Sequence, residues 1–218
     1  MSGRAMIIVA GGTSSRFGGD KLMAQIAGQP LLAHTVAAVA PLVDVCVLVC
    51  REEHATEMSK VAPNLILVRG GVTRTRSELA GLGAVPDSID IIGIHDGARP
   101  LASKSLVNRL FEVAAETGGA VPVLATSNPL VRRSDLRPVS DTAIAQTPQV
   151  FLGPELQSAY RAAAAAGFEG HDTAAVVKEF SELTIVAVPG ETGNIKVTYP
   201  ADLDAVRAVL EPSRSELR

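Results

Sequence analysis

The fold is decided by residues 6–21, which read Met6-Ile7-Ile8-Val9-Ala10-Gly11-Gly12-Thr13-Ser14-Ser15-Arg16-Phe17-Gly18-Gly19-Asp20-Lys21. The apolar run at the start is typical of a parallel strand that is buried on both faces. The glycines after it carry no Cβ, so the main chain can turn sharply and bring its N–H groups close to a ligand. Such a turn binds anions, and Arg16 and Lys21 add two positive charges beside it. The stretch therefore predicts a strand followed by a phosphate-binding loop, most simply one for a triphosphate.

Two common phosphate loops do not match this one. A Walker loop ends in Gly-Lys-Ser/Thr, whereas Lys21 is followed by Leu22. The dinucleotide motif Gly-x-Gly-x-x-Gly does not occur in the loop either. An ordinary glycine-rich turn, with Arg16 and Lys21 in solvent, is the alternative that the loop alone leaves open.

Length and composition favour one domain over residues 1–218. The chain is 47% hydrophobic, which is enough for one large α/β domain, and Cys46 and Cys50 in an apolar run are expected to be small buried hydrophobic residues. The net charge of −3 gives no electrostatic case for a nucleic-acid or membrane partner. The start lacks a signal-peptide pattern, and no apolar run has membrane-spanning length. We therefore expect a cytoplasmic protein.

Apolar runs alternate with helical patterns along the chain. Strands are predicted at residues 5–10, 45–50, 65–68, 91–95, 120–124 and 184–188. Helices are predicted at about 30–40, 54–61, 74–82, 103–117, 153–166, 172–179 and 200–210, with Ser103 as an N-cap. This alternation predicts an α/β fold with a doubly wound, mostly parallel sheet and helices on both faces. Ligands in such folds bind at the carboxyl ends of the strands, where the first loop lies.

Residues 125–149 interrupt the alternation. They contain Pro129, Pro138 and Pro148 and show no clear helical pattern. A loop of this length inside a compact domain is uncommon and usually functional. Because strand and helix patterns resume directly afterwards, we expect a hairpin-like arm that projects from the domain. The polar tail at 212–218 is expected to fray.

A second glycine turn precedes a helix. Residues 69–77 read Arg69-Gly70-Gly71-Val72-Thr73-Arg74-Thr75-Arg76-Ser77, so Arg74 and Ser77 lie in the first turn of the helix. A helix start favours anions and polar ligand edges, because its N–H groups are free and its dipole is positive there. A tight turn with solvated arginines is the alternative.

The run His95-Asp96-Gly97-Ala98-Arg99-Pro100 follows a strand predicted in the middle of the sheet. A carboxylate in that position, close to two phosphate loops, is well placed to hold Mg²⁺. A turn salt bridge between Asp96 and Arg99 is the less favoured interpretation. His95 has no second ligand at metal spacing, so we expect it to be structural.

These three segments, together with Gln146-Thr147-Pro148-Gln149-Val150-Phe151 and the run from Gly193-Asn194-Ile195-Lys196 to Leu203, resemble the 2-C-methyl-D-erythritol 4-phosphate cytidylyltransferases. The five motifs occur in order over residues 5–210. The first loop also resembles the molybdenum-cofactor nucleotidyltransferases, which have a related fold. The Thr-Pro-Gln and Asn-Ile-Lys-Val-Thr motifs favour the polyol-phosphate branch.

The resemblance implies a Rossmann-like nucleotidyltransferase that moves CMP from CTP to a small polyol phosphate, most simply methylerythritol phosphate in isoprenoid precursor synthesis. A phosphate monoester is already a nucleophile near neutral pH, so catalysis is positioning and charge stabilisation. By match to the family motifs, Arg16 and Lys21 stabilise developing charge and Asp96 holds Mg²⁺. The implied nucleotide site is Ala10, Gly11, Gly12, Ser14, Gly71, Arg74, Ser77, Asp96 and Ala98.

The resemblance also implies a homodimer in which the arm reaches the acceptor site of the neighbouring subunit. Lys196 matches the lysine that holds the acceptor phosphate, and Thr126 matches a threonine of the arm, although a plain turn residue is an equal alternative there. The arm arginine is Arg137, with Arg133 as a rival. The implied acceptor residues are Thr126, Thr147 and Asp172.

Three positions depart from the family pattern, and all lie on the acceptor side. Ala125 precedes Thr126 where an Asp is usual, Gly193 replaces an acid, and residues 171–175 read His-Asp-Thr-Ala-Ala where the family has Thr-Asp-Asp/Glu-Ala-Ser. Ribitol 5-phosphate or another sugar phosphate is therefore the alternative acceptor. A nucleotide-binding homologue without turnover is a further alternative, against which the intact Arg16, Lys21, Asp96 and Lys196 argue.

Overall fold

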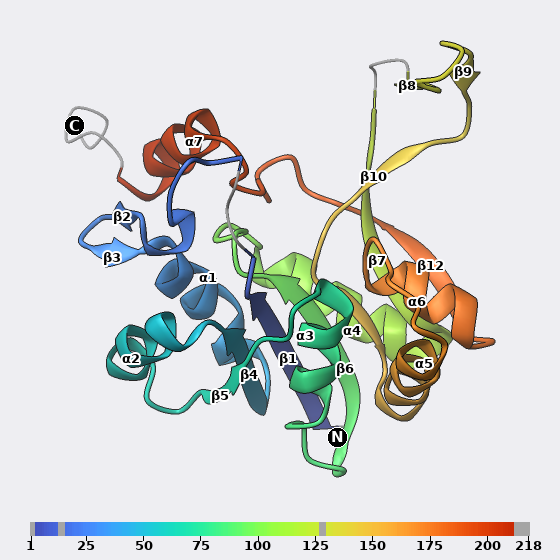
Figure 1. The fold of residues 1–218 in the computed structure, drawn as a ribbon, viewed down its shortest axis with the longest axis horizontal. Helices are drawn as coiled ribbons and strands as arrows, with labels where there is room; N and C mark the ends of the chain where they lie inside the picture. The colour runs from blue at the N-terminus through green and yellow to red at the C-terminus, as the bar shows by residue number, and fades with distance from the viewer. Residues whose placement is uncertain (1–2, 13–15, 127–129, 212–218) are drawn as a thin grey trace.

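The computed structural model describes residues 3–12, 16–126 and 130–211 (Figure 1). The predicted site residue Ser14, Pro129 of the arm and the tail at 212–218 lie outside these ranges. The strands of the main sheet are β1 (Gly3–Ala10), β4 (Val45–Cys50), β5 (Ile66–Arg69), β6 (Ile89–Asp96), β7 (Gly118–Ala125), β10 (Ala143–Ala145), β11 (Gln149–Leu152) and β12 (Thr184–Pro189). The α-helices are α1 (Leu31–Val39), α2 (Glu52–Val61), α3 (Arg74–Leu82), α4 (Lys104–Thr117), α5 (Gly153–Ala166), α6 (Thr173–Phe180) and α7 (Pro200–Leu210).

The main sheet is mixed but mostly parallel. Among the described residues its strand order is β10-β7-β11-β6-β1-β4-β5, and β12 pairs with β7. Strands β1, β4, β5 and β6 run parallel to one another, as do β7 and β12. Strand β11 is antiparallel to both β6 and β7, and β10 is antiparallel to β7. The α/β fold with a mostly parallel sheet is therefore confirmed.

Strand β11 is the one core strand that the sequence pattern did not reveal. Its residues are almost fully buried, and it lies between β6 and β7 near the middle of the sheet. The strand has only 4 residues, and it directly follows Pro148. A short apolar run after a proline shows neither helical nor alternating periodicity, so the sequence pattern does not predict this strand.

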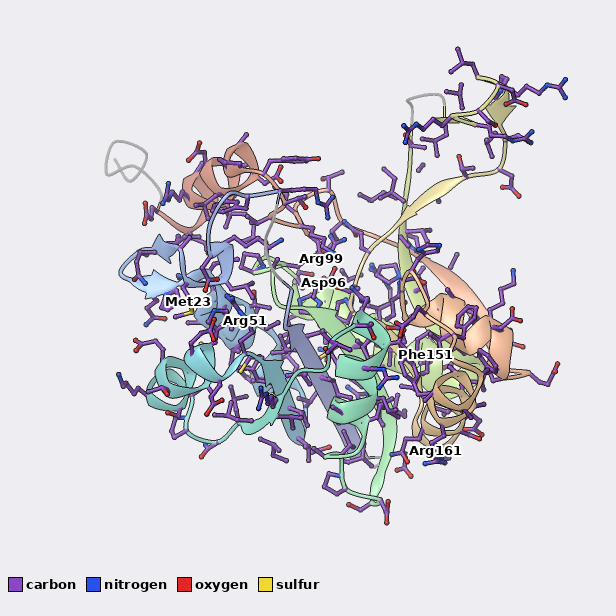
Figure 2. All side chains as sticks on the ribbon, in the orientation of Figure 1. Met23, Arg51, Asp96, Arg99, Phe151 and Arg161 are labelled. Carbon is purple, nitrogen blue, oxygen red and sulfur yellow. The ribbon has the colours of Figure 1, made fainter. Side chains whose placement is uncertain are left out.

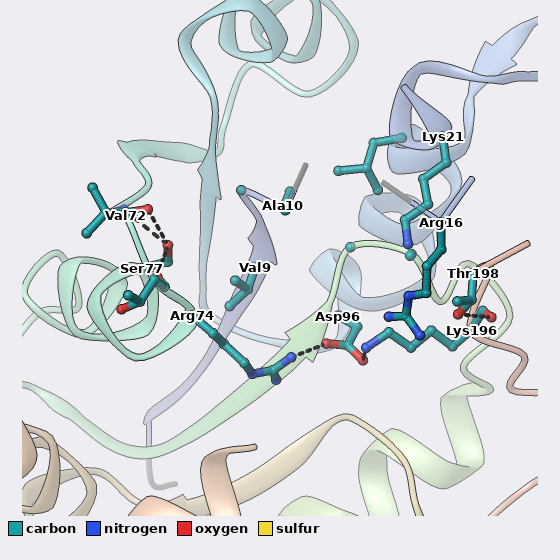
Figure 3. Close-up of a pocket in the computed structure, with 17 residues that line it drawn as sticks. Val9, Ala10, Arg16, Lys21, Val72, Arg74, Ser77, Asp96, Lys196 and Thr198 are labelled. Carbon is teal, nitrogen blue, oxygen red and sulfur yellow. Dashed lines mark hydrogen bonds and ion pairs between the residues drawn. The ribbon is translucent and has the colours of Figure 1, made fainter. Parts of the chain in front are cut away.

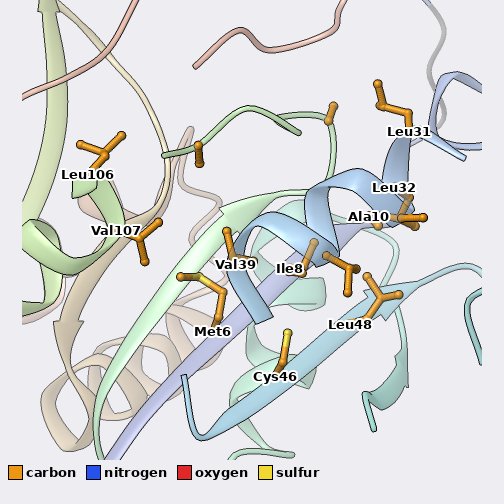
Figure 4. Packing of buried hydrophobic residues seen from close by; sticks show 14 of the residues in the cluster. Met6, Ile8, Ala10, Leu31, Leu32, Val39, Cys46, Leu48, Leu106 and Val107 are labelled. Atoms are coloured by element: carbon orange, nitrogen blue, oxygen red, sulfur yellow. The ribbon is translucent and has the colours of Figure 1, made fainter. Parts of the chain in front are cut away.

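Helices cover both faces of the sheet because side chains alternate along each strand. On β1, Met6, Ile8 and Ala10 belong to a cluster that includes buried residues of α1, α4 and α7 (Figure 4). Ala5 and Ile7 point the other way, into a cluster with buried residues of α3, α5 and α6. These two clusters are the core, and they hold the carboxyl ends of β1 and β6 side by side.

The remaining predictions about the core agree with the structure. Cys46 and Cys50 are buried free thiols, and burial raises the pKa of Cys46 to about 12. Ser103 caps α4 by accepting a hydrogen bond from the N–H of Leu106 (3.1 Å). Gly118 ends that helix with a φ of +108°, a left-handed value that favours glycine. No helix within the described ranges is long and apolar enough to cross a membrane.

The segment after β7 extends away from the body of the molecule, as Figure 1 shows. Its tip is a pair of short antiparallel strands, β8 (Leu130–Val131) and β9 (Pro138–Val139). Its base is formed by β7 and β10, so residues 143–145 of the predicted arm, like Gln149 in β11, belong to the main sheet. The tip exposes several large apolar side chains, namely Leu130, Val131, Leu136 and Val139.

Candidate active site

A cavity of about 410 Å³ opens where β1 and β6 end (Figure 3). Its wall combines the first glycine loop, the start of α3, the end of β6 and the segment before α7. The lining includes the predicted residues Ala10, Gly11, Gly12, Arg16, Lys21, Gly71, Arg74, Ser77, Asp96, Ala98 and Lys196. Residues that are far apart in the sequence thus meet at the carboxyl edge of the sheet, where an α/β fold binds its ligands.

The loop before α3 is held by its own hydroxyl groups. Thr73 is the N-cap of α3 and accepts a hydrogen bond from the N–H of Arg76 (3.2 Å). The Ser77 hydroxyl donates to the carbonyl of Thr73 (2.8 Å) and accepts from the N–H of Gly71 (3.1 Å). A Cβ on Gly71 would lie 2.6 Å from the Cβ of Arg76, so only glycine fits there. Ser77 therefore shapes the cavity wall as well as lining it.

Asp96 lies at the centre of the charged part of the cavity. Its carboxylate is 2.8 Å from Nη1 of Arg74, 2.8 Å from Nζ of Lys196 and 3.3 Å from Nε of Arg99. Burial alone would raise the pKa of Asp96, but these three cations outweigh it and hold the pKa well below its usual range. The carboxylate is therefore ionised at any pH at which the protein works.

The ion pair between Asp96 and Arg99 is thus formed, and it exists alongside the contacts to Arg74 and Lys196. His95 is structural, as predicted, because its Nε2 contacts the carbonyl of Arg99 (3.0 Å) and its Nδ1 contacts the Thr147 hydroxyl (3.1 Å). Burial lowers the pKa of His95 to about 4, so its imidazole is neutral. Within the described ranges, no group of three or more His, Cys, Asp or Glu side chains is arranged to hold a metal.

The segment that carries Lys196 is attached to the end of β6 by buried polar side chains. Arg99 donates to the carbonyl of Asn194 (2.7 Å), and Gln146 donates to the same carbonyl (3.2 Å). Asn194 in turn donates to the carbonyl of Thr147 (2.9 Å). No specific role was assigned to Gln146 or Asn194 from the sequence, although both lie in the recognised motifs. The burial of Gln146 and Asn194 and their hydrogen bonds to the backbone show that both residues hold the segment that carries Lys196.

The cavity lining carries four cationic side chains and one carboxylate, which suits a polyanionic ligand. The ammonium group of Lys21 donates to the carbonyl of Val197 (2.8 Å). Burial, followed by the nearby charge of Lys196, lowers the pKa of Lys21. In Figure 3 the Arg16 side chain extends toward Asp96 and Lys196. Figure 2 places Asp96 and Arg99 near the centre of the molecule, at the upper end of the sheet.

The other predicted residues lie outside this cavity. Arg137 is at the tip of the arm, with its side chain 78% exposed and 3.5 Å from Asp135. Thr126 follows the last residue of β7 at the base of the arm. The Thr147 hydroxyl accepts from the N–H of Asp96 (3.0 Å). Asp172 caps α6 by accepting from the N–H of Ala175 (2.9 Å), and it also accepts from Gln149 (2.8 Å).

Comparison with known proteins decides the family. Residues 4–212 match the model of the 2-C-methyl-D-erythritol 4-phosphate cytidylyltransferase (IspD) family. The chain belongs to this family. An IspD-family protein named 2-C-methyl-D-erythritol 4-phosphate cytidylyltransferase from Thermobifida fusca is 35% identical, over 94% of this chain and 92% of its own length.

Two further comparisons show the extent of the IspD likeness. The bifunctional enzyme IspD/IspF of Rhodobacter capsulatus is 34% identical over 94% of this chain, which spans only 55% of that protein's length. The crystal structure of 2-C-methyl-D-erythritol 4-phosphate cytidylyltransferase from Thermus thermophilus superposes with a TM-score of 0.81 at 29% identity. That likeness covers 97% of this chain and all of the solved one.

Proposed function

We propose that this protein transfers CMP from CTP to the phosphate of 2-C-methyl-D-erythritol 4-phosphate and releases pyrophosphate. The observation that carries the proposal is the cavity at the ends of β1 and β6, with four cations around one ionised carboxylate. Such a lining suits a triphosphate and a second phosphate group. Membership of the IspD family names the nucleotide and the acceptor.

In the proposed reaction an oxygen of the acceptor phosphate attacks the α-phosphorus of CTP. The new bond joins that oxygen to the α-phosphorus, and the bond from the α-phosphorus to the bridging oxygen of the β-phosphate breaks. The electron pair leaves with pyrophosphate, so no general base is needed. Arg16 and Lys21 are placed to stabilise the charge that grows on the phosphoryl oxygens, which is the main catalytic effect in such transfers.

The residues of the cavity fit a magnesium ion. Mg²⁺ is commonly held by one or two carboxylates together with substrate phosphates, and Asp96 offers one permanently ionised carboxylate to the cavity. When bound there, the ion would neutralise phosphate charge. The present partners of Asp96 would share it with the ion, and Lys196, which is 36% exposed, is the partner that is freest to turn to a phosphate.

The nucleotide base and ribose are assigned to the other half of the cavity. Gly71, Arg74 and Ser77 are assigned to frame the cytosine and its ribose, and Ala10, Gly11, Gly12 and Ala98 line the same cavity. Main-chain donors and acceptors at fixed positions can distinguish cytosine from uracil, because the wrong base leaves a buried group unpaired.

The acceptor site is assigned to Lys196 and to Thr126 and Arg137 of a second copy of the chain. The tip of the arm places Arg137 away from the body of its own subunit, and it exposes apolar side chains that a partner can cover. Thr147 and Asp172 are assigned to the acceptor site by motif match alone, and both side chains also have hydrogen-bond partners within the chain.

Pyrophosphate release over a panel of nucleoside triphosphates and polyol phosphates tests the proposal. We expect release with CTP and methylerythritol phosphate, and much less with UTP or ATP. Turnover of ribitol 5-phosphate with CTP in place of methylerythritol phosphate would replace the acceptor and leave the nucleotide assignment standing. Failure to use CTP with any acceptor would overturn the proposal.

A further inference from the structure

A buried carboxylate lies directly behind the cavity wall. Glu78 is on α3, one turn after Arg74, and only 1% of it is exposed. Its Oε1 is 2.9 Å from Nε of Arg74. The hydroxyl of Tyr160 on α5 donates to its Oε2 (2.5 Å), and the hydroxyl of Thr173 at the start of α6 donates to Oε1 (3.3 Å). Glu78 therefore connects three helices to a cavity residue without lining the cavity itself.

Arg74 contacts two carboxylates, of which Asp96 lines the cavity and Glu78 does not. Asp96 contacts its Nη1 at 2.8 Å, but Asp96 lines the cavity and also pairs with Lys196 and Arg99. Glu78 contacts Nε as an ion pair, since Nε makes no hydrogen bond of good geometry among the described residues. A ligand in the cavity can reach Asp96, whereas Glu78 does not line the cavity. The contact of Arg74 with Glu78 is therefore the one that lies out of reach of the ligand.

Stability alone does not account for this cluster. A buried ion pair can often be replaced by apolar side chains of similar size without loss of stability, because its desolvation is costly. The surroundings on this face of the sheet are apolar, with Leu82, Leu156 and Val176 among the buried neighbours. Burial raises the pKa of Glu78, while Arg74 and the two hydroxyl groups stabilise its ionised form. Glu78 nevertheless has an ion pair and two hydrogen bonds in this apolar layer, and its charged partner Arg74 lines the cavity.

We propose that Glu78 is a positioning residue for nucleotide recognition: with Tyr160 and Thr173 it fixes the guanidinium of Arg74 in the orientation that meets CTP. This inference rests on the proposed function, which assigns Arg74 to the nucleotide. Nη2 of Arg74 has no hydrogen-bond partner in the described part of the chain, and Arg74 lines the cavity, so an unpaired donor lies at the cavity wall. A fixed guanidinium binds with less loss of side-chain entropy than a free one.

The test measures CTP binding directly, by calorimetry with Mg²⁺ and without acceptor, so that no turnover occurs. Glu78→Gln keeps the shape of the side chain and removes its charge. Its affinity for CTP should be weaker by roughly tenfold, the change that 1.4 kcal/mol of binding free energy produces. The KM for the acceptor and kcat at saturating CTP should stay near those of the wild type. Tyr160→Phe should weaken CTP binding in the same direction and by less.

Glu116→Gln is the matched control, because it makes the same chemical change at an exposed position on α4. It should leave CTP affinity unchanged. An Arg74→Ala background supplies the decisive comparison, since adding Glu78→Gln there should weaken CTP binding no further. In the ligand-free protein the double variant should unfold at a higher temperature than Arg74→Ala alone, because Arg74→Ala leaves the Glu78 charge buried and unpaired.

Two results would overturn the inference and leave the proposed function intact. One is normal CTP affinity in Glu78→Gln. The other is an equal loss of CTP affinity when Glu78→Gln is added to the wild type and to Arg74→Ala. A wild-type protein that does not bind CTP would overturn both. If Glu78→Gln fails to fold, Tyr160→Phe and Thr173→Val carry the same comparison, since each removes one donor to the Glu78 carboxylate. Unchanged CTP affinity in both of these variants would then count against the inference.

Discussion

At the scale of single residues, Lys21 lies in surroundings unlike those of an ordinary surface lysine. Its ammonium group donates to the carbonyl of Val197, and burial and the charge of Lys196 lower its pKa. Desolvation strengthens the interaction of such a cation with an anion that enters the cavity. The same surroundings make the charge of Lys21 sensitive to pH and to substitution.

We expect Lys21→Ala and Arg16→Ala to lose turnover far more than CTP affinity. Both cations are assigned to charge that grows in the transition state, and losing one such contact costs about 10²–10³ in kcat. Steady-state kinetics and calorimetry with CTP measure the two effects separately. Lys104→Ala, at the exposed start of α4, is the control and should be neutral. Near-normal kcat in either loop variant would remove that residue from the catalytic assignment.

The lowered pKa of Lys21 predicts the alkaline side of the pH profile. The ammonium group of the free enzyme loses its proton at a lower pH than an ordinary lysine, whose value is 10.5, so kcat/KM for CTP should decline before pH 10.5 is reached. Arginine keeps its charge throughout this range. The alkaline decline should therefore move to higher pH in Lys21→Arg, whatever its absolute rate. Identical alkaline limbs in the two proteins would assign the decline to another group.

At the scale of elements, the loop before α3 depends on close packing of its own backbone. A Cβ on Gly71 would meet the Cβ of Arg76 at 2.6 Å and the carbonyl carbon of Arg76 at 3.0 Å. The loop also relies on the Ser77 hydroxyl, which bonds to Gly71 and Thr73. The position of Arg74 at the cavity follows from this packing, because Arg74 is the first residue of the helix.

Gly71→Ala should therefore displace the loop. We expect a loss of about 1–3 kcal/mol in unfolding free energy, the usual cost of adding a methyl group to a packed site, and weaker CTP binding. Urea unfolding and calorimetry measure these changes. Gly19→Ala is the control, because a Cβ at Gly19 would meet nothing within 4 Å. Equal stability of the two variants would show that the loop absorbs the extra methyl group.

At the scale of the whole molecule, the arm is the feature that the single chain does not explain. Its tip lies away from the body (Figure 1), exposes Leu136 to 71%, and carries Arg137, which directly precedes β9 and does not line the cavity of its own chain. A second copy of the chain would cover these apolar side chains and bring Arg137 to a cavity.

Mixed dimers test this arrangement. Lys21→Ala and Arg137→Ala chains should each be poorly active alone, and mixing them should restore part of the activity, because one of the two mixed sites carries neither substitution. Light scattering should show a dimer at micromolar concentration. Ser140→Ala, exposed on the same arm, is a control that should be active by itself. A fully active monomer would exclude a shared site.

The sequence by itself determined the alternation of most strands and helices, the main glycine loops and the family resemblance. Helices α3, α5 and α7 have the predicted bounds, because their apolar periodicity and their caps are local properties of the chain. The grouping of Arg16, Lys21, Arg74 and Asp96 followed from one topological rule, namely that loops after parallel strands share an edge of the sheet, whereas Lys196 was assigned by motif resemblance. The Mg²⁺ and acceptor roles of single residues remain predictions.

Only the tertiary structure decided the partners of those residues. Strand β11 gives no periodic signal, and its place between β6 and β7 depends on pairing with strands distant in sequence. The contacts of Glu78 with Tyr160 and Thr173 span 82 and 95 positions, and nothing local in the sequence marks a buried glutamate as the partner of an arginine. For Asp172 and Thr147, motif matching predicts an acceptor role, and only the fold shows that Asp172 also caps α6 and that Thr147 also accepts from the N–H of Asp96. Hydrogen bonds and ion pairs act over a few ångströms, so they are decided only when packing brings distant segments together.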